Sequence, residues 1–194
     1  MSTISTFLKS YTSRRTQYQL KKALPEGVTL QQVQDIVQQL VKHTPTSFNS
    51  QTVRAVILTG ALHDKVWQSV TDAIPAEAQK KRPNSIKEEA YGSIIFFDDG
   101  AALKKIQEAF PPYADYFPIF ASTSNGAAQI NTWTLIGELG LGGHLQHYNP
   151  LVQEALKGKV PESWNVVAQL AFGVPVGEPS EKEFIDNEVK VLSE

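Results

Sequence analysis

The segment from Ala127 to Leu139 constrains the fold more than any other part of this sequence. Wound as a helix, it is apolar around almost its whole circumference. A helix without a polar face has to be enclosed, so we expect it to be the central and most buried helix of the molecule. Gly140 follows it and is expected to end it as the C′ residue, because glycine adopts the left-handed conformation without a Cβ penalty.

Helical spacing of apolar residues predicts two further capped helices near the N-terminus. The first begins behind Ser2, a candidate N-cap, and ends near Arg14. The second opens at Thr29, where Gln32 completes a capping box, and stops at Pro45 because proline cannot continue a helix. Both are expected to bury one apolar face.

The rest of the chain predicts a sheet surrounded by helices. Further helices are expected over residues 62–74, 103–110 and 149–156, the last with Asn149 as N-cap. Strands are expected over residues 55–58, 93–97 and 164–172, with a turn at 98–100 closing the second. Residues 75–92 are polar and expected to be irregular. The tail after Pro175 is polar but carries scattered apolar residues, so we expect it to dock on another surface.

Composition excludes several classes of function. A chain of 194 residues with 41% hydrophobic content suits one domain, which we expect to span residues 1–194. The chain has 18 basic and 20 acidic residues, so it lacks the net positive charge that would attract it to nucleic acid. The absence of cysteine excludes disulfides and thiolate catalysis, so redox chemistry would have to come from a cofactor.

No targeting or membrane signal stands out. The N-terminus lacks a signal peptide, and no stretch is long and apolar enough to span a bilayer. We therefore expect a soluble cytoplasmic protein. The basic run from Lys80 to Arg82 is interpreted as a solvated loop. The alternative is that it is a nuclear localisation signal, in which case the protein would also be found in the nucleus.

Three stretches carry candidate ligand-binding residues. Arg14, Arg15 and Thr16 suit a phosphate or ribityl chain, although a helix end favours arginines in any case. The loop over residues 44–51 is rich in short hydrogen-bonding side chains, and Asn49 could match the edge of a flavin pyrimidine or simply form a turn. Glycines within residues 137–149 allow the backbone to approach a flat ligand.

Other site chemistries are not expected. The glycines after residue 137 follow a predicted helix rather than open one, so a dinucleotide fingerprint is excluded. His144 and His147 have no further ligand at compatible spacing, so no metal site is expected. No serine lies in a nucleophile elbow. We therefore expect no catalytic side chain.

Taken in order, these stretches and a lysine in the tail resemble the FMN contacts of the nitroreductase family. Longer stretches are similar to its fungal branch, which is implicated in fatty-acid repression and oxidative stress; they are residues 47–51, 54–58, 91–97 and 140–149. The resemblance implies an α+β fold, a mixed central sheet sandwiched by helices. It also implies a homodimer with shared active sites, in which the C-terminal arms, residues 176–194, are exchanged.

The resemblance also implies a role for each matching residue. The phosphate would be held by Arg14, Arg15 and Lys182, with Thr16 near the ribityl and pyrimidine portion. The partner subunit would contribute the next stretch, namely Pro45, Thr46, Ser47, Asn49 and Gln51. The reactive edge of the flavin would lie beside the backbone after a pair of glycines, at Gly142, Gly143, Leu145, Gln146 and His147.

The implied activity is reduction of nitroaromatics, quinones or related small electron acceptors by ping-pong hydride transfer, with bound FMN and NAD(P)H as co-substrate. The alternative is a non-catalytic flavin-binding redox sensor, a regulatory dimer in fatty-acid signalling. A plain interaction protein without a cofactor is disfavoured by the ordered series of contacts. The sequence leaves open the physiological acceptor and the choice between NADH and NADPH.

Overall fold

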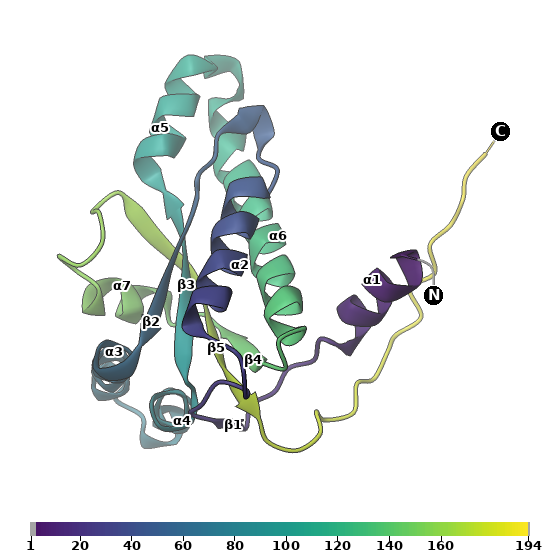
Figure 1. Ribbon diagram of the computed structural model, residues 1–194. Coiled ribbons are helices and arrows are strands. Elements are labelled where there is room, and N and C mark those ends of the chain that lie inside the picture. Colours follow the sequence, from purple (N-terminus) through teal and green to yellow (C-terminus); the bar gives the residue numbers. More distant parts are fainter. Residues whose placement is uncertain (1–2, 194) are drawn as a thin grey trace.

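An antiparallel sheet forms the centre of the computed structural model, which describes residues 3–193 (Figure 1). The strands are β1 (Leu20–Lys21), β2 (Val53–Thr59), β3 (Gly92–Asp99), β4 (Gly142–Gln146) and β5 (Trp164–Pro175). Their order is β1-β5-β3-β2, and β4 pairs with the edge of β5 opposite to β3. All four strand pairings are antiparallel, and the described residues add one parallel bridge, between Thr16 and Gly143.

Helices cover both faces of this sheet. They are α1 (Thr3–Ser13), α2 (Leu30–His43), α3 (Gly60–Ala73), α4 (Lys81–Glu89), α5 (Gly100–Ala109), α6 (Phe117–Gly137) and α7 (Asn149–Ala155), with 3₁₀ turns η1 (Ser47–Asn49), η2 (Glu77–Lys80) and η3 (Pro111–Tyr116). Side chains of β3 alternate between the faces. Ile94 and Phe96 pack with α2 and α6, while Ile95 and Phe97 pack with α3, α4 and α7. The expected α+β fold with helices around a central sheet is confirmed.

The predicted central helix is α6, the longest helix of residues 3–193, and it begins ten residues earlier than expected, at Phe117. Polar residues interrupt the apolar run there, but Asn125 donates to the Phe97 carbonyl of β3 at 3.1 Å, so the helix continues against the sheet. Gly140 takes the left-handed conformation with φ 77°, but α6 ends at Gly137 with Glu138 as its C-cap, so the prediction of Gly140 as the C′ residue is wrong. One side of α6 stays open in a single chain, since Leu135 is 41% and Ile119 60% exposed.

Several local predictions are confirmed. Thr29 and Gln32 form the capping box of α2, and the helix ends just before Thr44. The predicted strands are β2, β3 and β5, and the predicted helices α1, α3, α5 and α7 are present. The candidate N-cap Ser2 lies outside the described residues. No helix of residues 3–193 combines the length and the apolar character that crossing a bilayer requires.

The prediction that residues 75–92 are irregular is wrong, because they contain η2 and α4. Only Pro83 and Ile86 of α4 are buried, so its apolar pattern is too weak to recognise, and packing against α3 supplies the stability that propensity lacks. The turn predicted at residues 98–100 is also wrong. The Asp99 carboxylate caps α5, accepting from the amides of Ala101 at 3.0 Å and Ala102 at 3.4 Å.

Asn149 is not the N-cap of α7, because Tyr148 occupies that position. Its side chain instead binds β5: the amide donates to the Val167 carbonyl at 2.8 Å and accepts from Gln169 at 2.7 Å. Beyond Pro175 the chain forms no helix or strand within the described residues, and it runs out past α1 (Figure 1). The docking surface expected for this tail stays a prediction.

Candidate functional site

The segment between α1 and β1 lies along the free edge of β4. The amide of Gln17 donates to the Gly143 carbonyl at 2.9 Å, and Thr16 bridges the same residue. The residues predicted from the arginine pair and those predicted from the glycine-rich stretch therefore meet in one place. The glycine-rich turn expected there is a strand, since β4 covers residues 142–146.

Close packing of the chain on itself requires the two glycines of β4. A Cβ on Gly143 would lie 2.6 Å from the Ala171 carbonyl oxygen of β5, and one on Gly142 would lie 2.9 Å from the Pro175 Cβ. Real Cβ atoms essentially never approach other atoms below 3.0 Å. The sequence interpretation assigned these glycines to the approach of a ligand. In the structure they first allow β4 to pair with β5.

A cavity of about 510 Å³, here called the tail cavity, joins the arginine pair to the tail. It is lined by Arg14, Arg15, Thr16, Tyr18 and residues 180–183. Arg15 donates a hydrogen bond to the Ser180 carbonyl, and this contact brings Lys182 to the two arginines. All three predicted phosphate ligands, each cationic, therefore border one cavity, together with Glu181 and Glu183.

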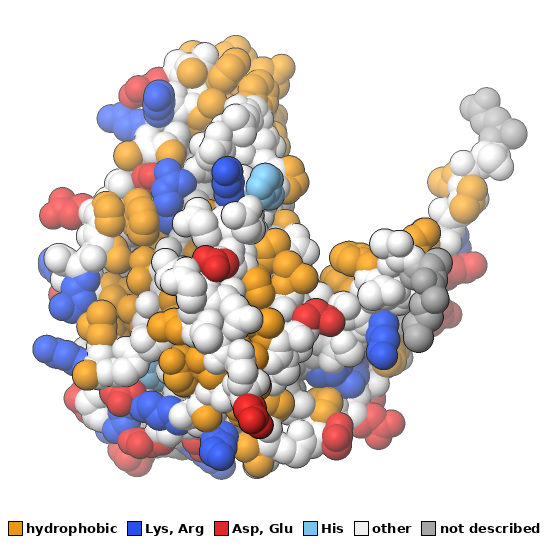
Figure 2. Space-filling view, viewed as in Figure 1, with side chains coloured by type: hydrophobic (Ala, Val, Ile, Leu, Met, Phe, Trp, Pro, Cys, Tyr) orange, Lys and Arg blue, Asp and Glu red, His pale blue; other side chains and the backbone are white. Residues whose placement is uncertain are grey.

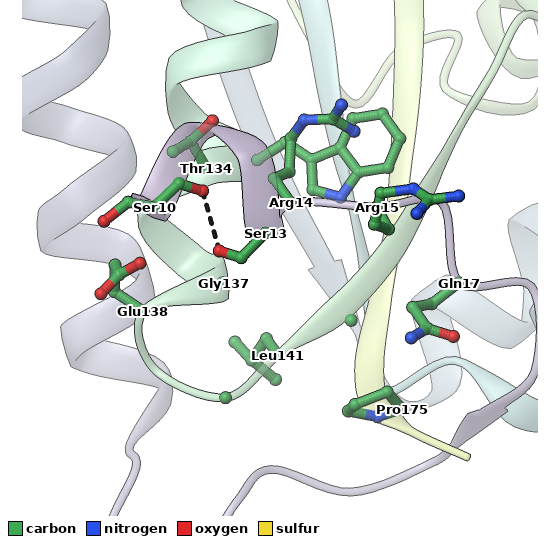
Figure 3. Close-up of a pocket in the computed structure, with 13 residues that line it drawn as sticks. Ser10, Ser13, Arg14, Arg15, Gln17, Thr134, Gly137, Glu138, Leu141 and Pro175 are labelled. Carbon is green, nitrogen blue, oxygen red and sulfur yellow. Dashed lines mark hydrogen bonds between the residues drawn. The ribbon is translucent and has the colours of Figure 1, made fainter. Parts of the chain in front are cut away.

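Arg14 and Arg15 also line a smaller cavity of about 180 Å³ between the ends of α1 and α6 and the start of β4 (Figure 3). The Arg14 side chain is the more constrained of the pair. Its guanidinium lies 4.4 Å over the Trp133 ring, and its Nε atom is buried without a hydrogen-bond partner in residues 3–193. A buried donor without a partner costs free energy. Three cations and this unsatisfied donor form a set that suits a phosphate group.

Tyr18, His144 and Arg82 form a cluster beside the tail cavity. The Arg82 guanidinium lies 4.1 Å over the Tyr18 ring, whose centre is 5.2 Å from that of His144. Burial lowers the pKa of His144 to about 4, and the charge of Arg82 contributes to the same shift. The imidazole is therefore neutral at pH 7, and its Nδ1 accepts from the Gln146 amide at 3.0 Å. His144 is a packing residue behind Tyr18.

Sequence reasoning missed Arg82 and Tyr18. Arg82 was interpreted as part of a solvated loop, but it lies half-buried at the start of α4. Because α4 was not recognised, nothing indicated that its first turn would return to the segment after α1. The predicted residues Leu145 and Gln146 are half-buried on β4, and His147 is exposed at its end.

The loop over residues 45–51 lies at the opposite end of α6 from the tail cavity. Its Phe48 ring lies 5.4 Å from Phe117 at the start of α6, whereas Arg14 covers Trp133 near the end of that helix. Sixteen residues separate the two positions on α6, which is about 24 Å at 1.5 Å per residue. A single chain therefore does not bring this loop and the arginines to one isoalloxazine ring.

Comparison with known proteins identifies a family for this chain. The nitroreductase family matches residues 11–177. The Saccharomyces cerevisiae nitroreductase-family protein HBN1 is 52% identical over 193 residues, covering 100% of both chains. The nitroreductase FRM2 of the same organism is 48% identical over 191 residues, covering 98% of this chain and 99% of that protein. The sequence similarity to the fungal branch is thereby confirmed.

Solved structures share the fold. Nitroreductase CinD from Lactococcus lactis, in complex with chloramphenicol, superposes with a TM-score of 0.84 at 40% identity, covering 93% of this chain and 95% of that one. A more distant nitroreductase-like protein from Desulfovibrio desulfuricans, in complex with FMN, superposes with a TM-score of 0.65 at 16% identity, covering 92% and 91%.

Proposed function

The chain belongs to the nitroreductase family of oxidoreductases, and from this premise we propose that it binds FMN and uses NAD(P)H to reduce nitroaromatics, quinones or related acceptors by a ping-pong reaction. The observation that carries the proposal is the convergence of Arg14, Arg15 and Lys182 on the tail cavity. These residues come from the two ends of the chain, and their three positive charges meet at one opening. A phosphate group would suit this opening, because charge-assisted hydrogen bonds from cationic side chains are strong.

The chain's own residues would bind and orient the cofactor. Arg14, Arg15 and Lys182 would hold the phosphate with charge-assisted hydrogen bonds, and the Thr16 hydroxyl lies beside them on the same cavity wall. The backbone of residues 143–147 would lie along one edge of the ring system. Bound FMN would supply the hydride and electron transfer, because the side chains of a protein without cysteine do not carry out such redox chemistry themselves.

We also propose that the active form is a homodimer with shared sites. The loop carrying Pro45, Thr46, Ser47, Asn49 and Gln51 would reach the cofactor held by the partner, since it is about 24 Å along α6 from the arginines of its own chain. Exposed apolar side chains on α1, such as Phe7 at 62%, support such an interface.

Exchange of the C-terminal arms is part of this proposal. Residues 184–193 continue past the part of the tail that lines the tail cavity, and four of their aliphatic side chains are at least four-fifths exposed; these are Ile185, Val189, Val191 and Leu192. Burying such side chains against a partner would stabilise both. On the resemblance to the fungal branch, we place the enzyme in the cytoplasm, with the nucleus as a second location, and in oxidative-stress response or fatty-acid homeostasis.

FMN retention in three variants tests the phosphate site. Each charge-assisted hydrogen bond contributes about 1.5–3 kcal/mol, so Arg14→Ala and Lys182→Ala are each expected to weaken FMN binding roughly 10- to 150-fold in equilibrium dialysis. The matched control is Lys157→Ala, whose side chain is 78% exposed and does not line the tail cavity. Unchanged retention in both site variants, or a wild-type protein that stays colourless with FMN, would contradict the proposal.

Stopped-flow spectroscopy separates an enzyme from a redox sensor. FMN-loaded protein mixed anaerobically with NADH or NADPH is expected to bleach and then to regain its colour on addition of a nitroaromatic or quinone, over repeated cycles. A sensor need not turn over. Bleaching without reoxidation by any such acceptor would exclude the proposed activity while leaving FMN binding intact.

A further inference from the structure

The loop of η1 has an unusual backbone. Phe48, Asn49 and Gln51 have φ angles of 55°, 52° and 47°, all in the left-handed region. Asparagine tolerates this region, but a bulky residue such as phenylalanine adopts it only when surrounding structure compensates for the strain. Backbone strain of this kind clusters at ligand-binding and catalytic sites.

Aromatic rings surround the strained residue. The Phe48 ring lies 4.7 Å from Phe110 at the end of α5, 5.3 Å from Tyr113 of η3 and 5.4 Å from Phe117 of α6. We call these four residues the aromatic clamp. Figure 2 shows hydrophobic side chains gathered at this end of the molecule. Phe48 and Tyr113 nevertheless stay 46% and 48% exposed, so the clamp is not the interior of a core.

The start of α5 also contacts the η1 loop, through hydrogen bonds and an ion pair. Arg54 donates to the Gln51 carbonyl at 2.6 Å and to the carboxylate of Asp99 at 2.9 Å. The other oxygen of that carboxylate caps the first turn of α5 and accepts from Ser163 at 3.0 Å. One helix therefore contacts the loop through a charged pair at its start and through Phe110 at its end.

We propose that α5 and the aromatic clamp are a positioning device, which holds the loop over residues 46–51 in its strained shape so that Thr46, Ser47 and Asn49 face the cofactor of the partner chain. This inference rests on the proposed function. The clamp residues act through the loop, since Phe110 belongs to none of the stretches matched to the cofactor. Packing alone would not require three left-handed residues within four positions.

The FMN dissociation constant of clamp variants tests the inference. Phe110→Ala removes the aromatic contact between Phe110 and Phe48, so we expect FMN binding about three- to tenfold weaker than in the wild type. Phe110→Tyr keeps the ring, so its FMN affinity should be within about twofold of the wild type. Hydrogen exchange without FMN gives a second measurement. The Gln51 amide, which donates to the Thr46 hydroxyl at 2.9 Å, is expected to exchange at least about tenfold faster in Phe110→Ala.

Two further variants distinguish positioning from simple packing. Tyr116→Ala removes a ring that is 55% exposed and stacks on Phe120 rather than on Phe48, and it should leave FMN affinity unchanged. Phe48→Gly removes both the strain and the ring that Phe110 contacts, so Phe110→Ala added to it should weaken binding by less than a further twofold if Phe110 acts through the loop.

The outcomes separate the two proposals. If Phe110→Ala lowers the melting temperature but binds FMN as the wild type does, with unchanged exchange in the loop, the clamp only packs and the inference is wrong. A wild-type chain that takes up no FMN would overturn the proposed function, and the inference with it.

Discussion

A methyl group added to Gly143 should disrupt both the sheet and the candidate site. The new Cβ of Gly143→Ala would lie 2.6 Å from the Ala171 carbonyl oxygen and 3.3 Å from the Leu170 Cδ1. The first neighbour is backbone in β5, paired on both edges, so it cannot move aside as a flexible side chain could. Instead β4 has to shift, and with it the carbonyl that accepts from Gln17.

Overpacking of this kind typically costs about 1–3 kcal/mol. For a chain of this length each kcal/mol lowers the melting temperature by roughly 2–4 °C, so a decrease of roughly 2–12 °C is expected. Because Thr16 bridges Gly143, the shift of β4 should also displace the arginine segment. FMN affinity is therefore expected to fall together with stability.

Urea unfolding and FMN titration measure both effects, and both use one fixed protein concentration because the stability of the proposed dimer would depend on it. The matched control is Gly126→Ala. A Cβ at that exposed position of α6 has no atom within 4 Å, and replacing a helical glycine by alanine should stabilise by up to about 1 kcal/mol. If Gly143→Ala unfolds within about 0.5 kcal/mol of the wild type, the packing argument is refuted.

Three further predictions concern other parts of the fold. His144 has a pKa near 4 when folded and an ordinary value of 6.5 when unfolded, so the folded state resists protonation and stability falls as the pH drops from about 6.5 toward 4. Between pH 7.5 and 4.5 the wild type should therefore lose about 2–3 kcal/mol more than His144→Gln in urea unfolding, and equal losses would contradict the assignment. Thr29→Ala removes the capping box of α2 and should cost about 1 kcal/mol in the same assay, with exposed Thr123→Ala as a comparison. Deletion of residues 177–194 should shift the mass in analytical ultracentrifugation from dimer toward monomer, whereas an unchanged dimer would argue against arm exchange.

Local sequence patterns predicted those helices and strands that are stabilised by residues close to one another in the chain. The capping box at Thr29 depends on atoms three residues apart, and the strand at residues 164–172 shows its burial by alternation. The α4 helix shows no such pattern, since packing against α3 rather than its own periodicity stabilises it. Asp99 could not be identified as a cap because the same residues serve a turn equally well.

For the candidate site, too, the sequence predicted some features and only the folded structure determined others. Residue types along the chain were sufficient to indicate Arg14 and Arg15 as candidate phosphate ligands. The resemblance to a family added Lys182 as a third candidate and placed the protein among the nitroreductases. Which residues meet was decided only by folding. A β-sheet edge and the length of α6 set the distances between segments far apart in the sequence, and those distances follow from side-chain packing that no local pattern encodes. For that reason the structure alone revealed that Gly143 is held against β5, that Arg82 reaches Tyr18, and that the loop at Phe48 lies too far from the arginines of its own chain.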